Sequence, residues 1–184
     1  MLITFLGPDG SGKTSLALAV SKNIEHVNYV YLGGNNTNRF YPYFNAFIKR
    51  NRNGVFFTAL KYLAIFCNNL IELRRTKKEH TVSDRSPIDE LLFTSGVRQK
   101  IQQFFHLFYR KPDLIILLTG NPKVLYERKH EISIKQIERY IYSYKKYTEK
   151  NKINHITLDT TALSLEECQL RVINEVKTLL SYAG

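Results

Sequence analysis

One short segment near the start of the chain has the residue types and spacing of a phosphate-binding loop. Residues 7–14 read GPDGSGKT, which fits the pattern G-x-x-x-x-G-K-[ST]. Glycines let the backbone curl so that successive N–H groups point at phosphate oxygens, and a helix beginning near Lys13 adds its positive N-terminal dipole. We expect Lys13 to reach the β- and γ-phosphates of a nucleoside triphosphate, with ATP expected, and the Thr14 hydroxyl to ligate Mg²⁺. The residues expected to bind ATP here are Gly7, Asp9, Gly10, Ser11, Gly12, Lys13, Thr14 and Ser15.

A second charged pair, Asp84 and Arg85, follows a strand-like run in the segment VSDRS (82–86). Ligands of open α/β sheets bind at the carboxyl ends of the strands, so both side chains are expected at that edge. Asp84 is placed to hold Mg²⁺, through water, or to accept a proton, and Arg85 to clamp a phosphate or a hydroxyl-bearing substrate. A structural ion pair at a strand end is the alternative. The nearby phosphate loop favours the functional interpretation.

These residues need elements that hold them, and short apolar runs alternate with longer helical patterns along the chain. The runs are β-branched or aromatic, as expected of strands covered on both faces. They lie at 2–6, 27–32, 80–84, 113–118 and 154–159. The helical patterns lie at about 13–25, 56–78, 87–108, 122–130, 134–150 and 164–181. The alternation predicts a three-layer α/β fold, with a parallel sheet of about five strands and helices on both faces, in a single domain over 1–184.

The amino-acid composition limits the class of protein but does not identify its binding partner. The formal net charge of +11 favours anionic partners, which include phosphorylated small molecules, nucleic acid and an acidic membrane surface. No apolar run reaches the roughly 18 residues of a membrane span, and no signal peptide is expected, so we expect a cytoplasmic protein. Cys67 and Cys168 lie in apolar helical patterns and are expected to be buried free thiols.

Three motifs in a fixed order resemble those of the thymidylate kinase-like P-loop kinases. They are GPDGSGKT, then SDRS, then KPDLIILLTGNPKVLYERKHE at 111–131, and the resemblance covers most of residues 1–160. It implies the P-loop kinase fold and ATP-dependent phosphoryl transfer, with Mg²⁺, to a small acceptor, a nucleoside monophosphate foremost. It also assigns catalytic roles to Lys13, Asp9, Asp84 and Arg85.

The resemblance assigns further roles residue by residue. Asp9 resembles the in-loop aspartate that meets the acceptor's sugar hydroxyl, and Arg128 the arginine at the lid entrance that stacks on adenine or touches phosphates. The basic stretch at 127–140, broken at Ile132–Ser133, is expected to be a lid that closes over the transferring group. Gly10 stands where some family members carry an arginine, so the lid is expected to supply the cation. The candidates are Lys129, Lys135 and Arg139.

The acceptor half departs from the family pattern and leaves the acceptor open. YLGGNNTNRF replaces the usual arginine–glutamate–proline–glycine turn, and the acceptor-side helix carries Asn68 and Asn69 with no arginine before Arg74. The DRS triplet is also similar to the E/D-R-S of deoxynucleoside kinases. Thymidylate, a neutral deoxynucleoside and a sugar-like alcohol all remain candidates. The candidate acceptor contacts are Asp9, Arg39 and Arg85.

The sequence also leaves open classes of protein other than a kinase. A basic and aromatic segment at 39–58 could stack nucleic-acid bases, and the apolar stretch 40–66 with basic flanks could lie on a membrane surface. We favour packed aromatics and a core helix over both. A non-catalytic ATP-binding switch is the third alternative, and a homodimer is left open. The segment's charged and aromatic members include Arg39, Phe40, Tyr41, Tyr43, Phe44, Phe47, Lys49, Arg50 and Arg52.

Overall fold

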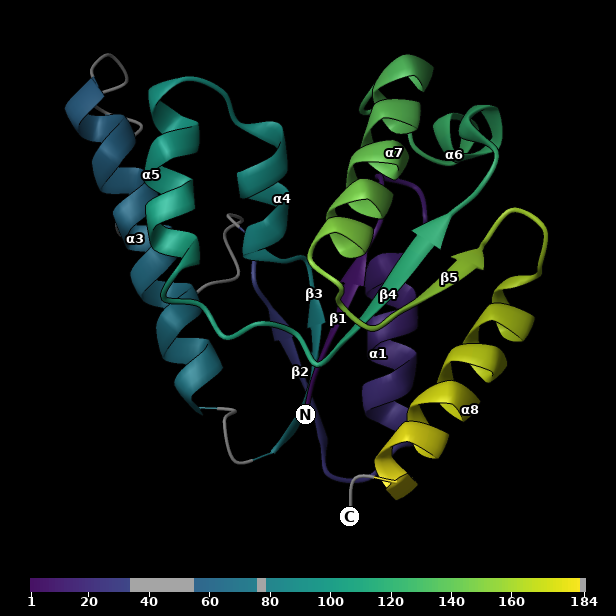
Figure 1. Cartoon of the computed structure of the whole chain (residues 1–184). Coiled ribbons are helices and arrows are strands. Elements are labelled where there is room, and N and C mark those ends of the chain that lie inside the picture. Colours follow the sequence, from purple (N-terminus) through teal and green to yellow (C-terminus); the bar gives the residue numbers. More distant parts are fainter. Residues whose placement is uncertain (34–54, 76–78, 183–184) are drawn as a thin grey trace.

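The computed structural model describes residues 1–33, 55–75 and 79–182, which form a five-stranded parallel sheet between two layers of helices (Figure 1). The strand order is β2-β3-β1-β4-β5, and every neighbouring pair is parallel. The α/β sheet expected from the sequence is confirmed. The strands span β1 (Leu2–Leu6), β2 (Val27–Tyr31), β3 (His80–Asp84), β4 (Leu114–Thr119) and β5 (His155–Asp159).

The central strands are apolar throughout because helices cover both of their faces. All five residues of β1 are buried, and so are the first five of β4. Successive side chains of a strand point to opposite faces. Leu114, Ile116 and Leu118 therefore join one core cluster, whereas Ile115 and Leu117 join another.

In the described part of the chain, α1 (Lys13–Asn23) and α8 (Leu165–Tyr182) cover the first face. Each contributes a buried stripe at helical spacing. The stripe of α1 is Leu16, Ala17 and Val20, and that of α8 is Cys168, Val172 and Val176. Ser164 and Glu167 form the capping-box contacts expected before α8, since each backbone N–H donates to the other's side chain.

The second face is covered by two groups of helices. Helices α4 (Pro87–Phe93) and α7 (Ile134–Lys150) pack against β1 and β4, with Ile88 and Tyr144 in the core. Helices α3 (Val55–Arg75) and α5 (Val97–His106) pack with Leu73, Phe66 and Phe105 beside β2. Helix α6 (Pro122–Arg128) follows β4 at the carboxyl edge of the sheet (Figure 1).

Two expectations about this face were wrong. The helix expected over 87–108 is broken into α4 and α5, because Thr94 is extended and Gly96 adopts a left-handed φ of 63°. Cys67 is exposed rather than buried, since α3 lies at the edge of the layer and turns that residue outward. Arg39 and the basic segment up to residue 54 lie outside the described residues.

No described helix is long and apolar enough to cross a membrane.

Candidate functional site

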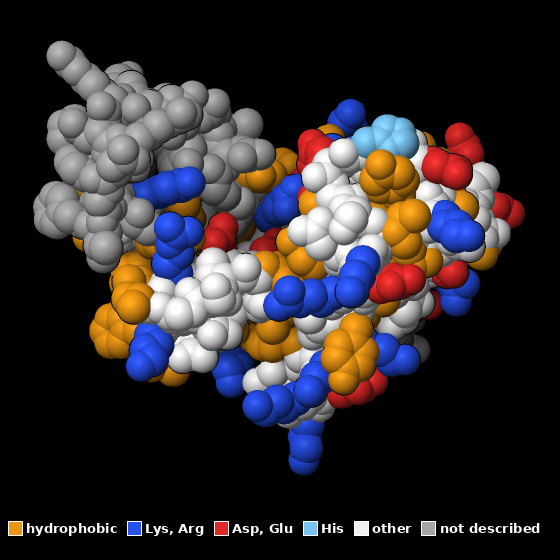
Figure 2. All heavy atoms as spheres, turned by 90° about the horizontal axis from the view of Figure 1, so that it is seen from above, with side chains coloured by type: hydrophobic (Ala, Val, Ile, Leu, Met, Phe, Trp, Pro, Cys, Tyr) orange, Lys and Arg blue, Asp and Glu red, His pale blue; other side chains and the backbone are white. Residues whose placement is uncertain are grey.

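The carboxyl ends of the parallel strands meet at one edge of the sheet, which brings the motif residues together. Phe5 of β1 and Tyr31 of β2 both lie in register with Asp84 of β3. The loop after β1 and the turn after β3 are therefore neighbours. Figure 2 looks down on this edge and shows Lys, Arg, Asp and Glu side chains gathered around a hollow.

Two glycines of the loop at 7–14 have backbone shapes that other residues would strain. Gly10 and Gly12 both have a φ of 83°, in the left-handed region. A Cβ on Gly10 would lie 2.5 Å from the Leu125 carbonyl oxygen, so the loop packs closely against α6. A Cβ on Gly12 would meet nothing within 4 Å, so this side of the loop, at the start of α1, is open to a ligand. This is the geometry that a phosphate cradle requires.

The Lys13 ammonium lies inside this loop. Its Nζ donates to the carbonyl oxygens of Gly7 and Pro8, each at 2.7 Å, and lies 3.9 Å from Asp9 Oδ1. Burial, and next the positive charge of Arg85, lower the pKa of Lys13. Ser11 is buried and its hydroxyl donates to the Pro8 carbonyl, whereas Ser15 is exposed in the first turn of α1. Ser11 therefore stabilises the loop, and Lys13 supplies its charge.

The Thr14 hydroxyl and the Asp84 carboxylate, which the sequence predicts to hold Mg²⁺, are in direct contact. Thr14 Oγ1 donates to Asp84 Oδ2 at 2.5 Å, and the Tyr29 hydroxyl reaches the same oxygen at 3.3 Å. Burial, and then Asp84, raise the pKa of Tyr29 to about 12, so its hydroxyl remains a donor. Asp84 Oδ1 is buried without a hydrogen-bond partner, which is costly for a carboxylate unless a cation or water meets it.

These oxygens fit Mg²⁺, which prefers a few protein oxygens with its remaining positions filled by water and phosphate. The described residues contain no cluster of three His, Cys, Asp or Glu side chains that could hold a metal alone. Thr14 and Asp84 are thus the residues that would hold the ion beside a triphosphate.

An ion pair joins the phosphate loop to the turn after β3. Arg85 Nη2 donates to Asp9 Oδ1 at 2.8 Å. Arg85 has a φ of 72°, which non-glycine residues rarely adopt and which turns β3 sharply into α4. Strained backbone of this kind concentrates at functional sites. The structure therefore brings together Asp9, Lys13, Thr14, Asp84 and Arg85, as the motifs predicted.

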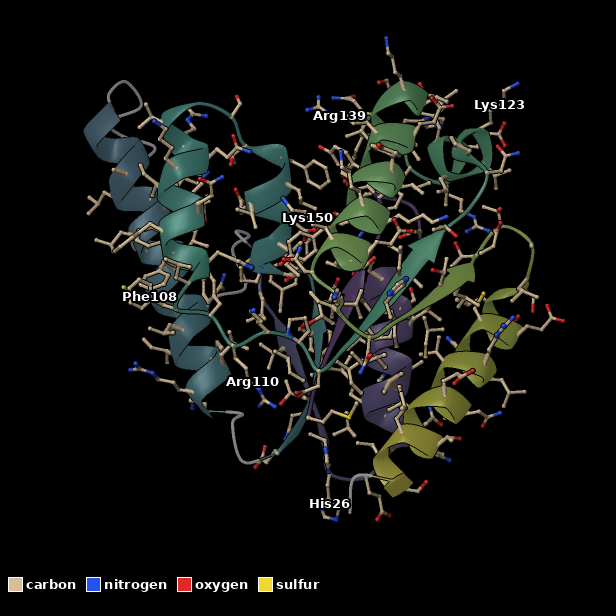
Figure 3. The ribbon with its side chains drawn as sticks, viewed as in Figure 1. His26, Phe108, Arg110, Lys123, Arg139 and Lys150 are labelled. Atoms are coloured by element: carbon tan, nitrogen blue, oxygen red, sulfur yellow. The ribbon has the colours of Figure 1, made fainter. Side chains whose placement is uncertain are left out.

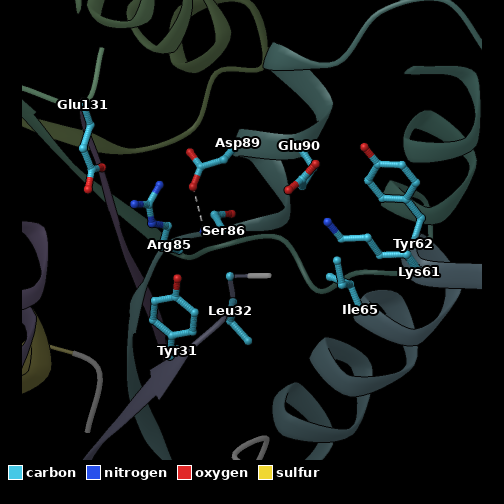
Figure 4. A pocket seen from close by; sticks show the side chains of 11 residues that line it. Tyr31, Leu32, Lys61, Tyr62, Ile65, Arg85, Ser86, Asp89, Glu90 and Glu131 are labelled. Atoms are coloured by element: carbon cyan, nitrogen blue, oxygen red, sulfur yellow. Dashed lines mark hydrogen bonds between the residues drawn. The ribbon is translucent and has the colours of Figure 1, made fainter. Parts of the chain in front are cut away.

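A cavity of about 480 Å³ opens beside Arg85 (Figure 4). A smaller cavity of about 190 Å³ lies between it and the phosphate loop, and Gly7 and Asp9 line it. Charged side chains of both signs face the larger space. Its lining is Tyr31, Leu32, Gly33, Lys61, Tyr62, Ile65, Arg85, Ser86, Asp89, Glu90 and Glu131.

A third cavity, of about 300 Å³, lies on the other side of the phosphate loop. Gly10, Gly12 and Arg128 line it, together with residues that follow β5. The Arg128 guanidinium donates to the Thr160 carbonyl oxygen at 2.9 Å, which fixes the end of α6 to the loop after β5. Arg128 thus lines a cavity beside the loop at 7–14, and its contact with ATP stays a prediction. The further lining residues are Ser11, Leu16, Thr160, Leu165 and Cys168.

The break expected in the basic stretch at 127–140 is confirmed, because α6 ends at Arg128 and α7 begins at Ile134. Ser133 caps α7 in a capping box with Gln136. Among the candidate cations, Lys129 pairs with Glu131 at 3.1 Å, and Lys135 and Arg139 are exposed. Arg139 projects from the upper part of α7 on the side toward α4 (Figure 3).

Several site residues were not expected from the sequence. Asp89 and Glu90 follow Arg85 by one helical turn, and Tyr140 and Tyr144 reach the small cavity from α7. A spacing of four residues puts the two tyrosines on one helix face, which is the signal that the sequence offered.

Asn68, Asn69 and Arg74, which mark the departure of α3 from the family pattern, do not line the cavity of about 480 Å³. Asn68 and Asn69 are buried, and Asn69 donates to the Leu32 carbonyl oxygen. Arg74 is exposed in the last turn of α3, about 20 Å along the helix axis from Lys61. Arg74 therefore cannot supply a cation to the acceptor, and Arg39 lies outside the described residues.

No protein-family model and no curated protein matches this chain by sequence. Solved structures do match it in fold. A deoxyadenosine kinase from M. mycoides, with the products dCMP and dCDP bound, shares 16% identity over 97% of this chain and 100% of that chain, with a TM-score of 0.69. A thymidylate kinase from Ehrlichia chaffeensis shares 18% identity over 96% and 98%, with a TM-score of 0.62. The chain has the fold of the P-loop kinases.

At this level of identity the likeness concerns the fold alone. A second structure of the M. mycoides kinase, with dATP bound, has a TM-score of 0.63 at 17% identity, over 96% of this chain and 100% of that chain. What the site does is therefore argued from this chain's own residues.

Proposed function

We propose that the protein is an ATP-dependent phosphotransferase that acts on a small acceptor of the nucleoside or nucleoside monophosphate class. The Asp9–Arg85 pair carries this proposal, because it joins the phosphate loop directly to the acceptor-sized cavity. A loop built to bind phosphate alone would need no such connection. The neighbours of similar fold are kinases of deoxyadenosine and thymidylate, which supports the same acceptor classes.

The residues divide the work of phosphoryl transfer, which consists mainly of positioning and charge stabilisation. Lys13 holds the β- and γ-phosphates, and the amides at Gly10 and Gly12 cradle them. Thr14 and Asp84 would hold Mg²⁺, and the ion would supply positive charge against the phosphates. Arg85 faces the acceptor cavity, where it orients the acceptor toward the γ-phosphorus.

The lid of this proposal is the segment at 127–140, which runs from the end of α6 into the first part of α7. Arg128 marks its start beside the nucleotide cavity, and Lys129, Lys135 and Arg139 are its candidate cations. Closure of the lid would bring a cation over the transferring group and exclude water. Arg139 is favoured, because it projects toward α4 (Figure 3), whereas Lys129 already pairs with Glu131.

The experiment that tests the proposal is Mg²⁺-dependent ATP consumption against a panel of acceptors. The panel contains deoxyadenosine, deoxycytidine and thymidine, their 5′-monophosphates, and neutral sugars. ATP consumption that requires one of these acceptors supports the proposal. If the protein binds ATP but consumes none with any of these acceptors, the proposal is refuted and the non-catalytic switch is favoured.

Whether the protein forms a homodimer stays a prediction, and sedimentation velocity would measure it.

A further inference from the structure

Asp89 is a site carboxylate that the mechanism above does not use. It lies in the first turn of α4 and lines both the acceptor cavity and the small cavity over the phosphate loop. Figure 4 shows it beside Arg85, between that residue and Glu90. Asp89 is thus placed between the acceptor and the loop that would hold the γ-phosphate.

Both oxygens of Asp89 are oriented by hydrogen bonds and can still accept another. The Ser86 backbone N–H donates to Oδ2 at 3.2 Å, and the Tyr144 hydroxyl of α7 donates to Oδ1 at 2.5 Å. Each carboxylate oxygen has two lone pairs, so a ligand hydroxyl can donate to either oxygen. The residue is only partly exposed, and it lines both cavities.

The surroundings of Asp89 make it a stronger base than an ordinary aspartate. Burial raises the pKa of its carboxyl, and the Tyr144 hydrogen bond and the charges of Lys13 and Arg85 act in the opposite direction. A base works best when its pKa lies near the working pH. The titratable and charged groups that face Asp89 are Tyr31 of β2, Arg85 at the end of β3, Lys13 in the phosphate loop, Asp9 across the small cavity, Glu90 of α4, and Tyr140 and Tyr144 of α7.

The charges around the acceptor cavity disfavour a phosphorylated acceptor. Two cations in the described lining, Lys61 and Arg85, face three carboxylates. Arg85 forms an ion pair with Asp9 at 2.8 Å, and Glu131 forms one with Lys129 at 3.1 Å. Lys61 points toward Glu90 in Figure 4 and is a cation that acts on it. Among the described residues Asp89 forms no ion pair, so its charged form would repel a phosphate dianion placed beside it.

We propose that the acceptor is a neutral nucleoside whose hydroxyl is phosphorylated, and that Asp89 takes the proton of that hydroxyl. This inference rests on the proposed function and narrows its acceptor. The acceptor O–H bond breaks and its proton passes to Asp89. The acceptor oxygen forms a bond to the γ-phosphorus, and the bond from that phosphorus to the β,γ-bridging oxygen breaks, leaving its electron pair on ADP. Asp89 then returns the proton to solvent. A monophosphate acceptor needs no such base, because its oxygen is already an anion.

The Tyr144→Phe variant tests this role without altering Asp89 itself. Loss of the hydroxyl removes a hydrogen bond that stabilises the charged carboxylate, so the pKa of Asp89 rises further. The acidic limb of the kcat/KM profile should then move to higher pH. Tyr147→Phe is the matched control, because Tyr147 lies one turn further along α7 and its hydroxyl meets His106 Nε2 at 2.9 Å instead. Its profile should coincide with that of the unaltered protein.

The assay is nucleoside-dependent ATP consumption from pH 5 to 9, with thermal unfolding of each variant to establish that it is folded. Asp89→Asn should lower kcat about 100-fold, in the range for loss of a general base. Asn can still accept from the Ser86 N–H, so a role limited to capping α4 would leave kcat nearly intact.

Each result decides between the parts of the proposal. The proposal is supported if ATP is consumed with nucleosides and if the acidic limb of the kcat/KM profile shifts in Tyr144→Phe but not in Tyr147→Phe. Consumption with monophosphates only would overturn the neutral acceptor while the proposed function stands. An unshifted limb in a folded, active Tyr144→Phe protein would overturn the role of Asp89. No ATP consumption with any acceptor would overturn the proposed function, and this assignment with it.

Discussion

The Asp9–Arg85 ion pair should couple the two halves of the site by a measurable free energy. Three variants test this: Asp9→Asn, Arg85→Gln and the double variant. The two side chains are 16% and 33% exposed, and the N–O distance is 2.8 Å. A double-mutant cycle isolates their interaction from the other effects of each substitution.

The expected magnitude follows from this partial burial. Fully exposed pairs contribute about 0.2–1 kcal/mol, and hydrogen bonds to charged groups about 1.5–3 kcal/mol. Since Arg85 is one-third exposed, solvent screens the ion pair. The coupling free energy should therefore not exceed about 1.5 kcal/mol, the lower end of the range for hydrogen bonds to charged groups. We expect a coupling of about 1 kcal/mol in the free energy of unfolding, measured by urea denaturation.

Kinetics on the same variants identify which substrate the pair serves. The Asp9→Asn variant should raise the acceptor KM about fivefold, which corresponds to ~1 kcal/mol, and should leave ATP affinity little changed. An amide can still accept a hydrogen bond from the acceptor, but more weakly than a carboxylate. A coupling within 0.3 kcal/mol of zero, about the error of additivity, would refute the assigned connection. Weakened ATP binding with an unchanged acceptor KM would place Asp9 on the donor side instead.

Four further substitutions test the phosphate loop and the two residues expected to hold Mg²⁺, Thr14 and Asp84. Lys13→Met should lower kcat by about 10³-fold or more, since it removes a cation from the transferring group. The protein should stay folded, so ATP consumption should stop while the unfolding curve is unchanged. Asp84→Asn should raise the Mg²⁺ concentration needed for half-maximal activity about 10-fold, which a titration of rate against Mg²⁺ measures. An unchanged Mg²⁺ requirement would contradict the assignment of Asp84 as a metal ligand. Gly10→Ala should lower the free energy of unfolding by about 1–3 kcal/mol, because its Cβ would meet the Leu125 carbonyl oxygen at 2.5 Å. Gly12→Ala is the control, because Gly12 has the same φ but a Cβ there would meet nothing within 4 Å. If Gly12→Ala lowered the free energy of unfolding as much as Gly10→Ala, the close packing of Gly10 against Leu125 would not be the cause.

The sheet and the phosphate loop were predictable because their physical causes are local. A run such as LIILL has no polar face and suits a strand covered on both sides, and β4 is that strand. The loop at 7–14 is specified by its own glycines, and Thr14 meets Asp84 because adjacent parallel strands end together. The motifs were therefore sufficient to predict that the loop at 7–14 and the end of β3 lie side by side.

The acceptor half could not be predicted because its residues come from separate elements. Asp89 and Glu90 look in sequence like acidic residues that favour the start of any helix, and α4 does use Asp89 as a cap. Its second role is visible only when Tyr144 arrives from α7, 55 residues further along the chain. The break between α4 and α5 likewise depends on Gly96 adopting a conformation that its neighbours in sequence do not specify.

The close approach of Gly10 to α6 also limits how this protein can change over evolutionary time. A single substitution to arginine at position 10 would drive its first side-chain carbon into the backbone of Leu125 before the guanidinium could help the reaction. A lineage that moved its cation from the lid to the loop would first have to displace α6. The loop glycine and the basic lid should therefore be inherited together. Homologues with an arginine in the loop should show a shifted α6 and a lid with fewer cations, and an alignment of related chains would reveal this as covariation between two distant segments.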